Sequence, residues 1–411
     1  MERHFPKRFL WGTATAAHHV EGENRGCDWW EFEQEPGRIL NNDRSGIACD
    51  SYNRYRQDFE LMKSLNLNSH RLSIEWSRIE YSPGQFDPRQ IDHYRDVLGS
   101  MRALGIVPMV TLHHFTSPLW FARRGGWAAS GAADAFMAFV RVVIRELGEL
   151  IPMWCTINEP NLYAYWGWIG GAFPPGRKGD VVGFLQVLAN MRVGHERAYA
   201  AIKEAFPEAA AAAVNAKVLM FPRDARRRAD RWAARLSQSL LDCWPRGRRH
   251  LQKVYESSGD YIGVNHYYGQ TAAFNPRRPG DGFIQRGNPP GSVVGEAGYA
   301  IDPAWMRQVL MQLAPLGKPI YVTESGVATN DDGVRCRYLN EVLAVVHAAI
   351  QSGVDVRGYF LFTLLDSFEW ALGYSGRFGL VEVDRKSLER HPKPSAALYS
   401  SIATANALPD A

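Results

Sequence analysis

Residues 153–160 of the chain read Met-Trp-Cys-Thr-Ile-Asn-Glu-Pro. The first five form a short run of mostly apolar residues, which is the composition of a buried strand. The polar pair Asn158-Glu159 follows at once, and Pro160 then ends the strand pattern. The stretch therefore predicts a strand over residues 153–157 whose end carries an amide and a carboxylate.

Seven further β-rich runs flank this strand, at residues 9–15, 69–75, 106–112, 211–215, 261–266, 320–323 and 357–362. Amphipathic, helix-like stretches lie between them, at residues 51–65, 87–104, 132–150, 182–205, 303–313 and 335–352. Eight strands that alternate with helices predict a closed (β/α)8 TIM barrel, as a single domain over residues 1–411. The stretch 274–298 is rich in Gly, Pro and Arg, so we expect a loop over one barrel end.

The composition is that of an ordinary globular protein, with 46% hydrophobic and 22% charged residues and a formal net charge of +4. The one cluster of arginines, at residues 223–235, is interpreted as a solvated helix face beside a loop, so no nucleic-acid partner is expected. No run approaches the ~18 apolar residues that a membrane span requires. Residues 7–16 imitate a short secretory signal, but Gly12 and two threonines interrupt them, which favours a buried first strand.

The five cysteines are far apart and include no C-x-x-C pair, which argues against a disulfide framework and predicts a cytoplasmic protein. We expect the pairs His18-His19 and His113-His114 to lie on strands, where neighbouring side chains point to opposite faces. Neither pair could then chelate one ion, so no metal or other cofactor is expected. One histidine of each pair should face the barrel interior. His195, within a predicted helix, is expected to be a packing residue, and the oligomeric state is left open.

Polar residues stand at the ends of several predicted strands. Asn158 and Glu159 follow the fourth strand, Asn265 and Tyr267 end the sixth, and Glu324 ends the seventh. The carboxyl ends of all strands in such a barrel meet at one face, where active sites are built. Glu159 and Glu324, 165 residues apart (324 − 159), should therefore converge. Two neighbouring carboxyls suit the hydrolysis of a glycosidic bond, although a structural pairing with arginine is an equal alternative on this evidence alone.

Five short motifs occur in order along the chain: Phe9-Leu10-Trp11-Gly12-Thr13-Ala14-Thr15 with Glu21-Gly22, Thr156-Ile157-Asn158-Glu159-Pro160, Val322-Thr323-Glu324-Ser325-Gly326, Leu364-Leu365-Asp366-Ser367-Phe368-Glu369-Trp370 and Gly373-Tyr374-Ser375. Together they make the chain similar to glycoside hydrolase family 1 from about residue 9 to residue 399. The resemblance implies a retaining β-glycosidase that hydrolyses terminal β-D-glycosyl residues by double displacement through a covalent glycosyl-enzyme. It implies β-glucosides first, with β-galactosides and β-fucosides as further candidates, and a small-molecule glycoside or oligosaccharide as the partner.

The resemblance also assigns roles to individual residues. Glu159 would be the general acid/base and Glu324 the nucleophile. Arg71 would keep the nucleophile ionised, Tyr267 would hydrogen-bond it, and Asn158 would contact the 2-hydroxyl of the sugar. The remaining candidate substrate-binding residues are His19, His114, Asn265, Tyr299, Phe362, Glu369 and Trp370. Among these, the resemblance places His114 at the minus-one sugar, Glu369 at its 4- and 6-hydroxyls, and Trp370 beneath it as a stacking surface.

The departures from the family pattern fall in the sugar-binding shell. His19 stands where a glutamine usually reads the 3- and 4-hydroxyls, and it offers fewer hydrogen bonds than an amide. Phe115, Phe362 and Tyr299 each replace a tryptophan, and Ser325 replaces an asparagine. These changes leave hydrolysis intact but leave the sugar undecided, with loose discrimination between gluco and galacto configurations expected.

Three alternatives are weighed against this hypothesis. Glu369 argues against a 6-phosphosugar substrate, because its carboxylate would repel phosphate. A transglycosylase would differ only in whether a sugar or water attacks the intermediate, and no residue discriminates between the two. A non-catalytic carbohydrate-binding protein on the same fold is disfavoured, because both glutamates are present.

Overall fold

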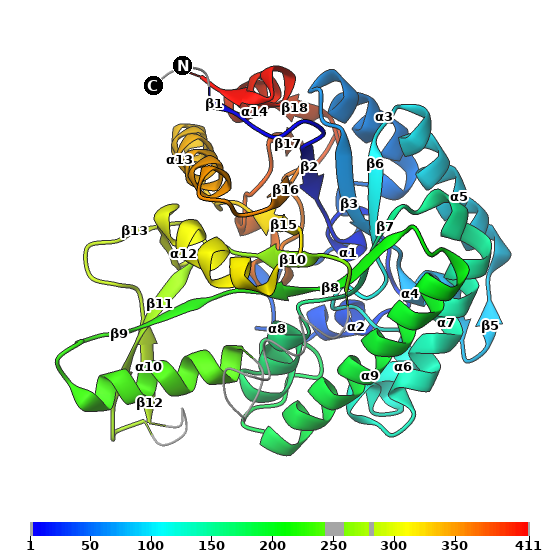
Figure 1. Ribbon diagram of the computed structural model, residues 1–411. Coiled ribbons are helices and arrows are strands. Elements are labelled where there is room, and N and C mark those ends of the chain that lie inside the picture. The colour runs from blue at the N-terminus through cyan, green and yellow to red at the C-terminus, as the bar shows by residue number, and fades with distance from the viewer. Residues whose placement is uncertain (1–2, 243–258, 279–282, 410–411) are drawn as a thin grey trace.

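The structure is a computed structural model that describes residues 3–242, 259–278 and 283–409 (Figure 1). Eight parallel strands close into a barrel in the order β10-β15-β16-β2-β3-β6-β7-β8, which confirms the predicted (β/α)8 fold. Each expected strand is present, with ends that differ from the prediction by at most two residues. The barrel strands are β2 (Leu10–Ala14), β3 (Ser69–Ser73), β6 (Val107–Thr111), β7 (Met153–Asn158), β8 (Ala210–Ala216), β10 (Ile262–Asn265), β15 (Ile320–Ser325) and β16 (Val356–Phe362).

The barrel strands are buried almost throughout, because helices cover their outer face while their side chains fill the interior. All six residues of β7 are buried, for example. At the seam where the last strand pairs with the first, Gly12 of β2 lies opposite Phe360 of β16. A Cβ atom at Gly12 would lie 2.6 Å from Cδ1 of Phe360, so the glycine makes room for the aromatic ring.

Amphipathic helices surround the barrel (Figure 1) and confirm the predicted stretches. Three of them begin with an aspartate, Asp87, Asp180 or Asp331, whose carboxylate accepts a backbone N–H of the first turn. None of the helices in the described part of the chain combines the length and apolarity that a bilayer crossing requires. The long helices are α3 (Ser51–Ser64), α5 (Pro88–Ala103), α7 (Ala132–Leu147), α9 (Val181–Ala205), α12 (Ala304–Leu313) and α13 (Asp332–Gln351).

Shorter elements occupy the connections between the barrel strands. The short helices are α1 (Ala17–Val20), α2 (Asp28–Glu33), α4 (Trp76–Ile79), α6 (Leu119–Arg123) and α8 (Pro160–Ala164), and a turn of π-helix, η4 (Tyr165–Ile169), continues α8. A small hairpin joins β4 (Glu80–Ser82) to β5 (Gln85–Phe86). Four cysteines, Cys27, Cys49, Cys155 and Cys336, are free thiols, while Cys243 lies outside the described residues.

A second sheet stands beside the barrel, where we expected only a loop. It is built from β9 (Leu219–Pro222), β11 (Gly269–Phe274), β12 (Ile284–Gly287), β13 (Val293–Val294) and β14 (Ala300–Ile301), and α10 (Arg228–Leu241) packs on it (Figure 1). The expectation of a loop over residues 274–298 is therefore wrong for β12 and β13. These strands have only four and two residues, too few to show an alternating pattern in the sequence.

The C-terminal region packs against the outside of the barrel and contacts its N-terminal part. The hairpin of β17 (Val381–Val383) and β18 (Arg390–Pro392) precedes α14 (Pro394–Ala405), and β19 (Ala407–Leu408) pairs with β1 (Arg3–His4), so both chain ends lie side by side (Figure 1). Arg390 of β18 donates from Nε to Oδ1 of Asp58 in α3 at 2.8 Å. Both side chains are buried, with 2% and 6% of their surfaces exposed.

Replacing Arg390 with alanine should destabilise the fold strongly, because Asp58 would be left buried without its cation. We expect a loss of about 3–5 kcal/mol in the free energy of unfolding, the cost of breaking a buried ion pair from one side. Denaturant unfolding followed by tryptophan fluorescence measures this loss. Arg357→Ala is the matched control, because Arg357 pairs with Asp355 at the surface, and its loss should cost less than about 1 kcal/mol. Equal losses in the two variants would contradict the expectation.

Candidate active site

The strand ends bring the predicted polar residues together at one end of the barrel. Arg71 comes from β3, Asn158 from the end of β7, Asn265 from the end of β10 and Glu324 from β15. Glu159 follows β7 directly and starts α8 in a left-handed backbone conformation, with φ of 43°. Such a conformation is costly for a residue with a side chain and is found preferentially at functional sites.

Arg71 is the hub of this cluster and is completely buried. Its Nη1 donates to Oε1 of Glu324, with which it forms an ion pair. Its Nη2 donates to Oδ1 of Asn158 at 2.6 Å. A guanidinium carries its charge at any physiological pH. The cluster therefore contains one fixed positive charge, and Glu324 lies directly against it.

Glu324 has a second donor on its other oxygen. The hydroxyl of Tyr267 donates to Oε2 of Glu324 at 2.7 Å. Nε2 of His114 lies 3.9 Å from Oε1 and 3.0 Å from Nδ2 of Asn158. The carboxylate is thus held in one orientation by groups from three other strand ends.

Glu159 has a different environment from Glu324. It is 5% exposed, forms no ion pair with any described residue, and accepts a hydrogen bond from Nδ2 of Asn265 at 2.7 Å. Burial, and next the negative charge of Glu324, raise the pKa of Glu159 to about 8. Asn265 is itself oriented by Thr323, whose hydroxyl donates to Oδ1 of Asn265 at 2.7 Å. One carboxyl therefore lies against a fixed cation while its neighbour keeps its proton more readily, the arrangement expected of a proton donor beside a nucleophile or base.

A second group of polar side chains lies next to the carboxyl pair and lacks partners within the described structure. The unpartnered buried atoms are both ring nitrogens of His19, Nδ1 of His114 and Oε2 of Glu369. Oε2 of Glu369 lies 3.6 Å from Nδ1 of His19, beyond hydrogen-bonding distance. A buried polar atom without a partner costs about 1–3 kcal/mol. These atoms are therefore suited to bind hydroxyl groups, which both donate and accept.

The charges of this second group are suppressed by burial. Burial, followed by the charges of Glu324 and Glu159, raises the pKa of Glu369 well above its usual value. Burial, followed by the charge of His18, lowers the pKa of His19 well below 6.5. Burial therefore opposes both charges, that of the Glu369 carboxylate and that of the His19 imidazolium.

Aromatic rings form the walls around these polar groups. Trp370 contacts His19, with ring centroids 4.1 Å apart, and Phe115 packs behind Trp370 at 5.2 Å. Phe362 lies 5.8 Å from the His19 ring. Tyr299 lies beside the site and stacks on Tyr268 at 4.3 Å. Ser325 takes no part in these walls, because its hydroxyl is hydrogen-bonded to that of Tyr338 at 2.6 Å.

The expectation that the adjacent histidines lie on strands is wrong for both pairs, since β6 ends at Thr111, before His113 and His114. His18 and His19 lie in the short helix α1, where successive residues also point in different directions. His18 points away from the site, with Nε2 3.5 Å from Oε2 of Glu33, while His19 faces Glu369. His113 and His114 follow β6, and His113 accepts from the indole Nε1 of Trp127 at 3.0 Å. One histidine of each pair therefore faces the site, as expected.

Two further results concern histidine and metal chemistry. His195 packs in α9 with Nδ1 2.6 Å from the hydroxyl of Thr156, so it contacts the barrel wall, in keeping with a packing residue. Among the residues that the structure describes, no three His, Cys, Asp or Glu side chains gather as a metal site would require.

Sequence reasoning missed two contributors to the site. Thr323 orients Asn265, and its only signal is its position directly before Glu324. Tyr268 stacks beside the carboxyl pair, and its signal is its position directly after Tyr267.

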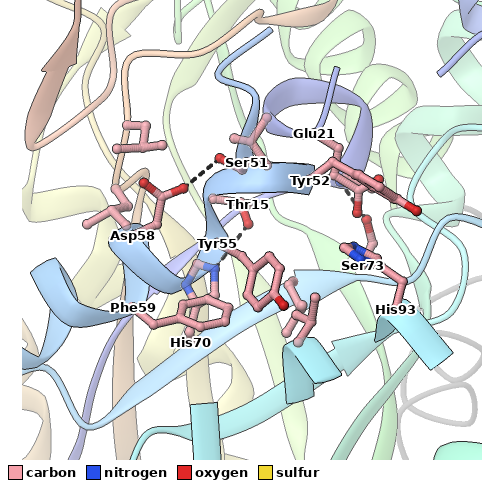
Figure 2. Close-up of a pocket in the computed structure, with 16 residues that line it drawn as sticks. Thr15, Glu21, Ser51, Tyr52, Tyr55, Asp58, Phe59, His70, Ser73 and His93 are labelled. Carbon is pink, nitrogen blue, oxygen red and sulfur yellow. Dashed lines mark hydrogen bonds between the residues drawn. The ribbon is translucent and has the colours of Figure 1, made fainter. Parts of the chain in front are cut away.

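A separate cavity lies outside the barrel, between β3 and the helices α3 and α5 (Figure 2). Its lining includes Glu21, Tyr52, His70 and His93, and its volume is about 50 Å³. By this measure a cavity needs roughly 10–15 Å³ to hold one water molecule, so this space takes a few water molecules and is too small for a sugar. Neither Glu159 nor Glu324 lines it, which leaves the strand-end cluster as the candidate active site.

Comparisons with known proteins agree with this geometry. The family model described as glycosyl hydrolase family 1 matches residues 1–248 and 248–408. The β-glucosidase A of Thermotoga maritima is 31% identical over 446 residues, with 99% of each chain covered. The structure of a β-glycosidase from Pyrococcus horikoshii superposes with a TM-score of 0.91 at 33% identity, covering 100% of this chain and 97% of that one.

A further solved structure bears on the site. The Thermotoga maritima β-glucosidase in complex with glucoimidazole superposes with a TM-score of 0.90 at 29% identity, and covers 98% of this chain and 99% of that one. Family model, full-length relatives and superposed structures all point the same way: the chain belongs to glycosyl hydrolase family 1 and is a glycoside hydrolase.

Proposed function

We propose that the protein is a retaining β-glycosidase in which Glu324 is the nucleophile and Glu159 the general acid/base. The observation that carries this proposal is the contrast between the two carboxyls. Glu324 is paired with the buried Arg71, whereas burial and the charge of Glu324 raise the pKa of Glu159 to about 8. One group is therefore ready to attack, and the other holds a proton at neutral pH.

In the first step, an oxygen of Glu324 bonds to the anomeric carbon while the bond from that carbon to the leaving oxygen breaks. Glu159 gives its proton to the leaving oxygen. In the second step, the Glu159 carboxylate takes a proton from water, the water oxygen bonds to the anomeric carbon, and Glu324 is released. Two inversions return the original configuration. The carboxyls are expected to lie ~5–5.5 Å apart, the separation of retaining enzymes.

The other residues of the site would hold the sugar. In our proposal Asn158 contacts the 2-hydroxyl, His114 lies beside it, and His19 and Glu369 bind the hydroxyls on the far side of the ring. Trp370 would supply the stacking surface. The unpartnered atoms of His19, His114 and Glu369 support this arrangement, because each would gain a hydrogen bond when a sugar binds.

A β-glucoside is the sugar we favour. The Thermotoga maritima relative is named a β-glucosidase, and its solved complexes include glucoimidazole and deoxynojirimycin. Burial disfavours the charged forms of Glu369 and His19, which suits contacts with uncharged hydroxyls. A β-galactoside or β-fucoside stays a second candidate, because His19 offers fewer donors and acceptors than the usual glutamine. A sugar in place of water would make the same intermediate a glycosyl donor for transglycosylation.

Removing each carboxyl in turn distinguishes their roles. Glu324→Ala should hydrolyse no substrate, because the attacking oxygen is gone. Glu159→Ala should still be glycosylated by 2,4-dinitrophenyl β-glucoside, whose leaving group needs little protonation. Added azide should restore turnover in both variants, giving the β-glycosyl azide with Glu159→Ala and the α-glycosyl azide with Glu324→Ala. Proton NMR identifies the anomers. Exchange of the two azide products between the variants would reverse the assignment of roles, and wild-type release of the α-anomer first would exclude retention.

The substitution His19→Gln tests the sugar-contact role of His19. We expect the ratio of glucoside to galactoside kcat/KM to change by about three- to tenfold, which corresponds to the gain or loss of one hydrogen bond. Nitrophenyl β-glucoside and β-galactoside measure this ratio, and thermal unfolding checks that the fold is intact. Because the pKa of His19 lies well below 6.5, the wild-type ratio should stay constant between pH 6 and 8. An unchanged ratio in a stable His19→Gln variant would show that His19 does not contact the sugar.

A further inference from the structure

The second sheet carries an arginine whose charge is not balanced within the described structure. Arg286 lies in β12 and is partly buried. Its one side-chain hydrogen bond among the described residues runs from Nη1 to the hydroxyl of Tyr165, at 2.5 Å. The guanidinium carbon also lies 4.9 Å from the centroid of the Tyr165 ring. A guanidinium has five N–H donors, so most of its capacity to bind an anion is unused.

The register of the sheet places this arginine on the same face as two tyrosines. Arg286 pairs with Ala272 of β11, and Tyr268 precedes Ala272 by four residues. Side chains alternate along a strand, so residues 268 and 272 point to one face, together with Arg286. Gly269 pairs with Ala300, which puts Tyr299 on that face too, and the stacking of Tyr268 on Tyr299 agrees with this.

This face borders the candidate acid/base residue. Burial, and next the charge of Glu159, raise the pKa of Tyr268 to about 12, while the charge of Arg286 acts in the opposite sense. Both charges therefore act on the same phenol from nearby. Tyr165 begins the π-helical turn that continues α8, the helix that starts at Glu159. Arg286 thus contacts a tyrosine on the helical segment that begins at Glu159.

The position of Arg286 relative to Glu159 determines which part of a bound substrate it would contact. In the proposed mechanism Glu159 gives its proton to the leaving oxygen, so the aglycone must lie on the side of Glu159. A planar aglycone there would have tyrosine rings to pack against. An anionic substituent on it would meet the free donors of Arg286, which pairs well with carboxylates because two parallel N–H groups match the two oxygens.

We propose that Arg286, together with Tyr165, Tyr268 and Tyr299, selects aryl β-glycosides whose aromatic aglycone carries a carboxylate, such as glycosides of phenolic acids. This inference rests on the proposed function and adds the class of leaving group to it. A purely structural role for Arg286, holding Tyr165 in place, would give the residue no preference for charge.

The test compares two aglycones that differ in charge and are similar in shape. Carboxyphenyl and carbamoylphenyl β-D-glucopyranosides, each substituted at the 3- or the 4-position, are assayed with the wild type and Arg286→Gln. For at least one position, the ratio of carboxyphenyl to carbamoylphenyl kcat/KM should fall about tenfold in the variant, as expected for loss of a charge-assisted hydrogen bond. Because the two leaving groups are the same in both proteins, their intrinsic reactivities cancel.

Arg223→Gln is the matched control. Nη2 of Arg223 lies 3.1 Å from where a Cβ of Gly287 would be, and residue 287 points to the opposite face from Arg286. This variant removes the same charge beside the same strand, and its ratio should equal that of the wild type. The wild-type ratio should also fall as salt is raised, because ions screen the attraction.

The remaining outcomes overturn the inference. If Arg286→Gln leaves the ratio unchanged at both positions, or slows both substrates equally, Arg286 acts only by ordering Tyr165. If Arg223→Gln lowers the ratio as much, the effect comes from the general field of the sheet. Hydrolysis of unsubstituted phenyl β-glucoside separates this result from failure of the proposed function. A wild type that hydrolyses neither phenyl β-glucoside nor the matching β-galactoside and β-fucoside would overturn both.

Discussion

The ion pair between Arg71 and Glu324 is the interaction on which the site depends. Arg71 is fully buried, and a buried charge is tolerated only when it is paired and hydrogen-bonded. The barrel supplies that pairing through Glu324 and Asn158, from β15 and β7. Arg71 is the fixed positive charge of the cluster and is paired with the carboxylate of Glu324. The negative charge of Glu324 in turn contributes to raising the pKa values of Glu159 and Glu369.

The responses of Glu159 and Glu369 follow from the same two causes. Both are buried, and the charge of Glu324 contributes to raising the pKa of each. The outcome is a site with an Arg71–Glu324 ion pair, a Glu159 carboxyl whose pKa is raised to about 8, and a buried wall of Glu369 and His19 in which charge is disfavoured. Chemically identical side chains thereby differ in how readily they carry a charge, through their surroundings alone.

The sequence predicted the barrel well, because the fold depends on local patterns, and the same patterns place both glutamates at strand ends. A buried strand such as 153–157 is an apolar run, and Glu159 and Glu324 are polar residues directly at strand ends. The features that the sequence did not reveal depend on very short elements or on the pairing register of strands. Helix α1 has four residues, too few for a helical period to show, so His18 and His19 were placed on a strand. The relation of Arg286 to Tyr268 exists only in the pairing register of β11 and β12, which composition does not reveal.

The most direct test of the account is the titration of the Glu159 carboxyl with and without the charge of Glu324. Carbon-13 NMR of protein labelled at the glutamate carboxyls can follow it, with the signal assigned by its loss in Glu159→Gln. The account predicts a pKa of about 8 in the wild type and a lower pKa in Glu324→Gln, still above the usual glutamate value because burial remains. Glu369→Gln should change the Glu159 pKa little, because Glu369 is not among the groups whose charge shifts it. A Glu159 pKa that stays the same or rises in Glu324→Gln would contradict the account.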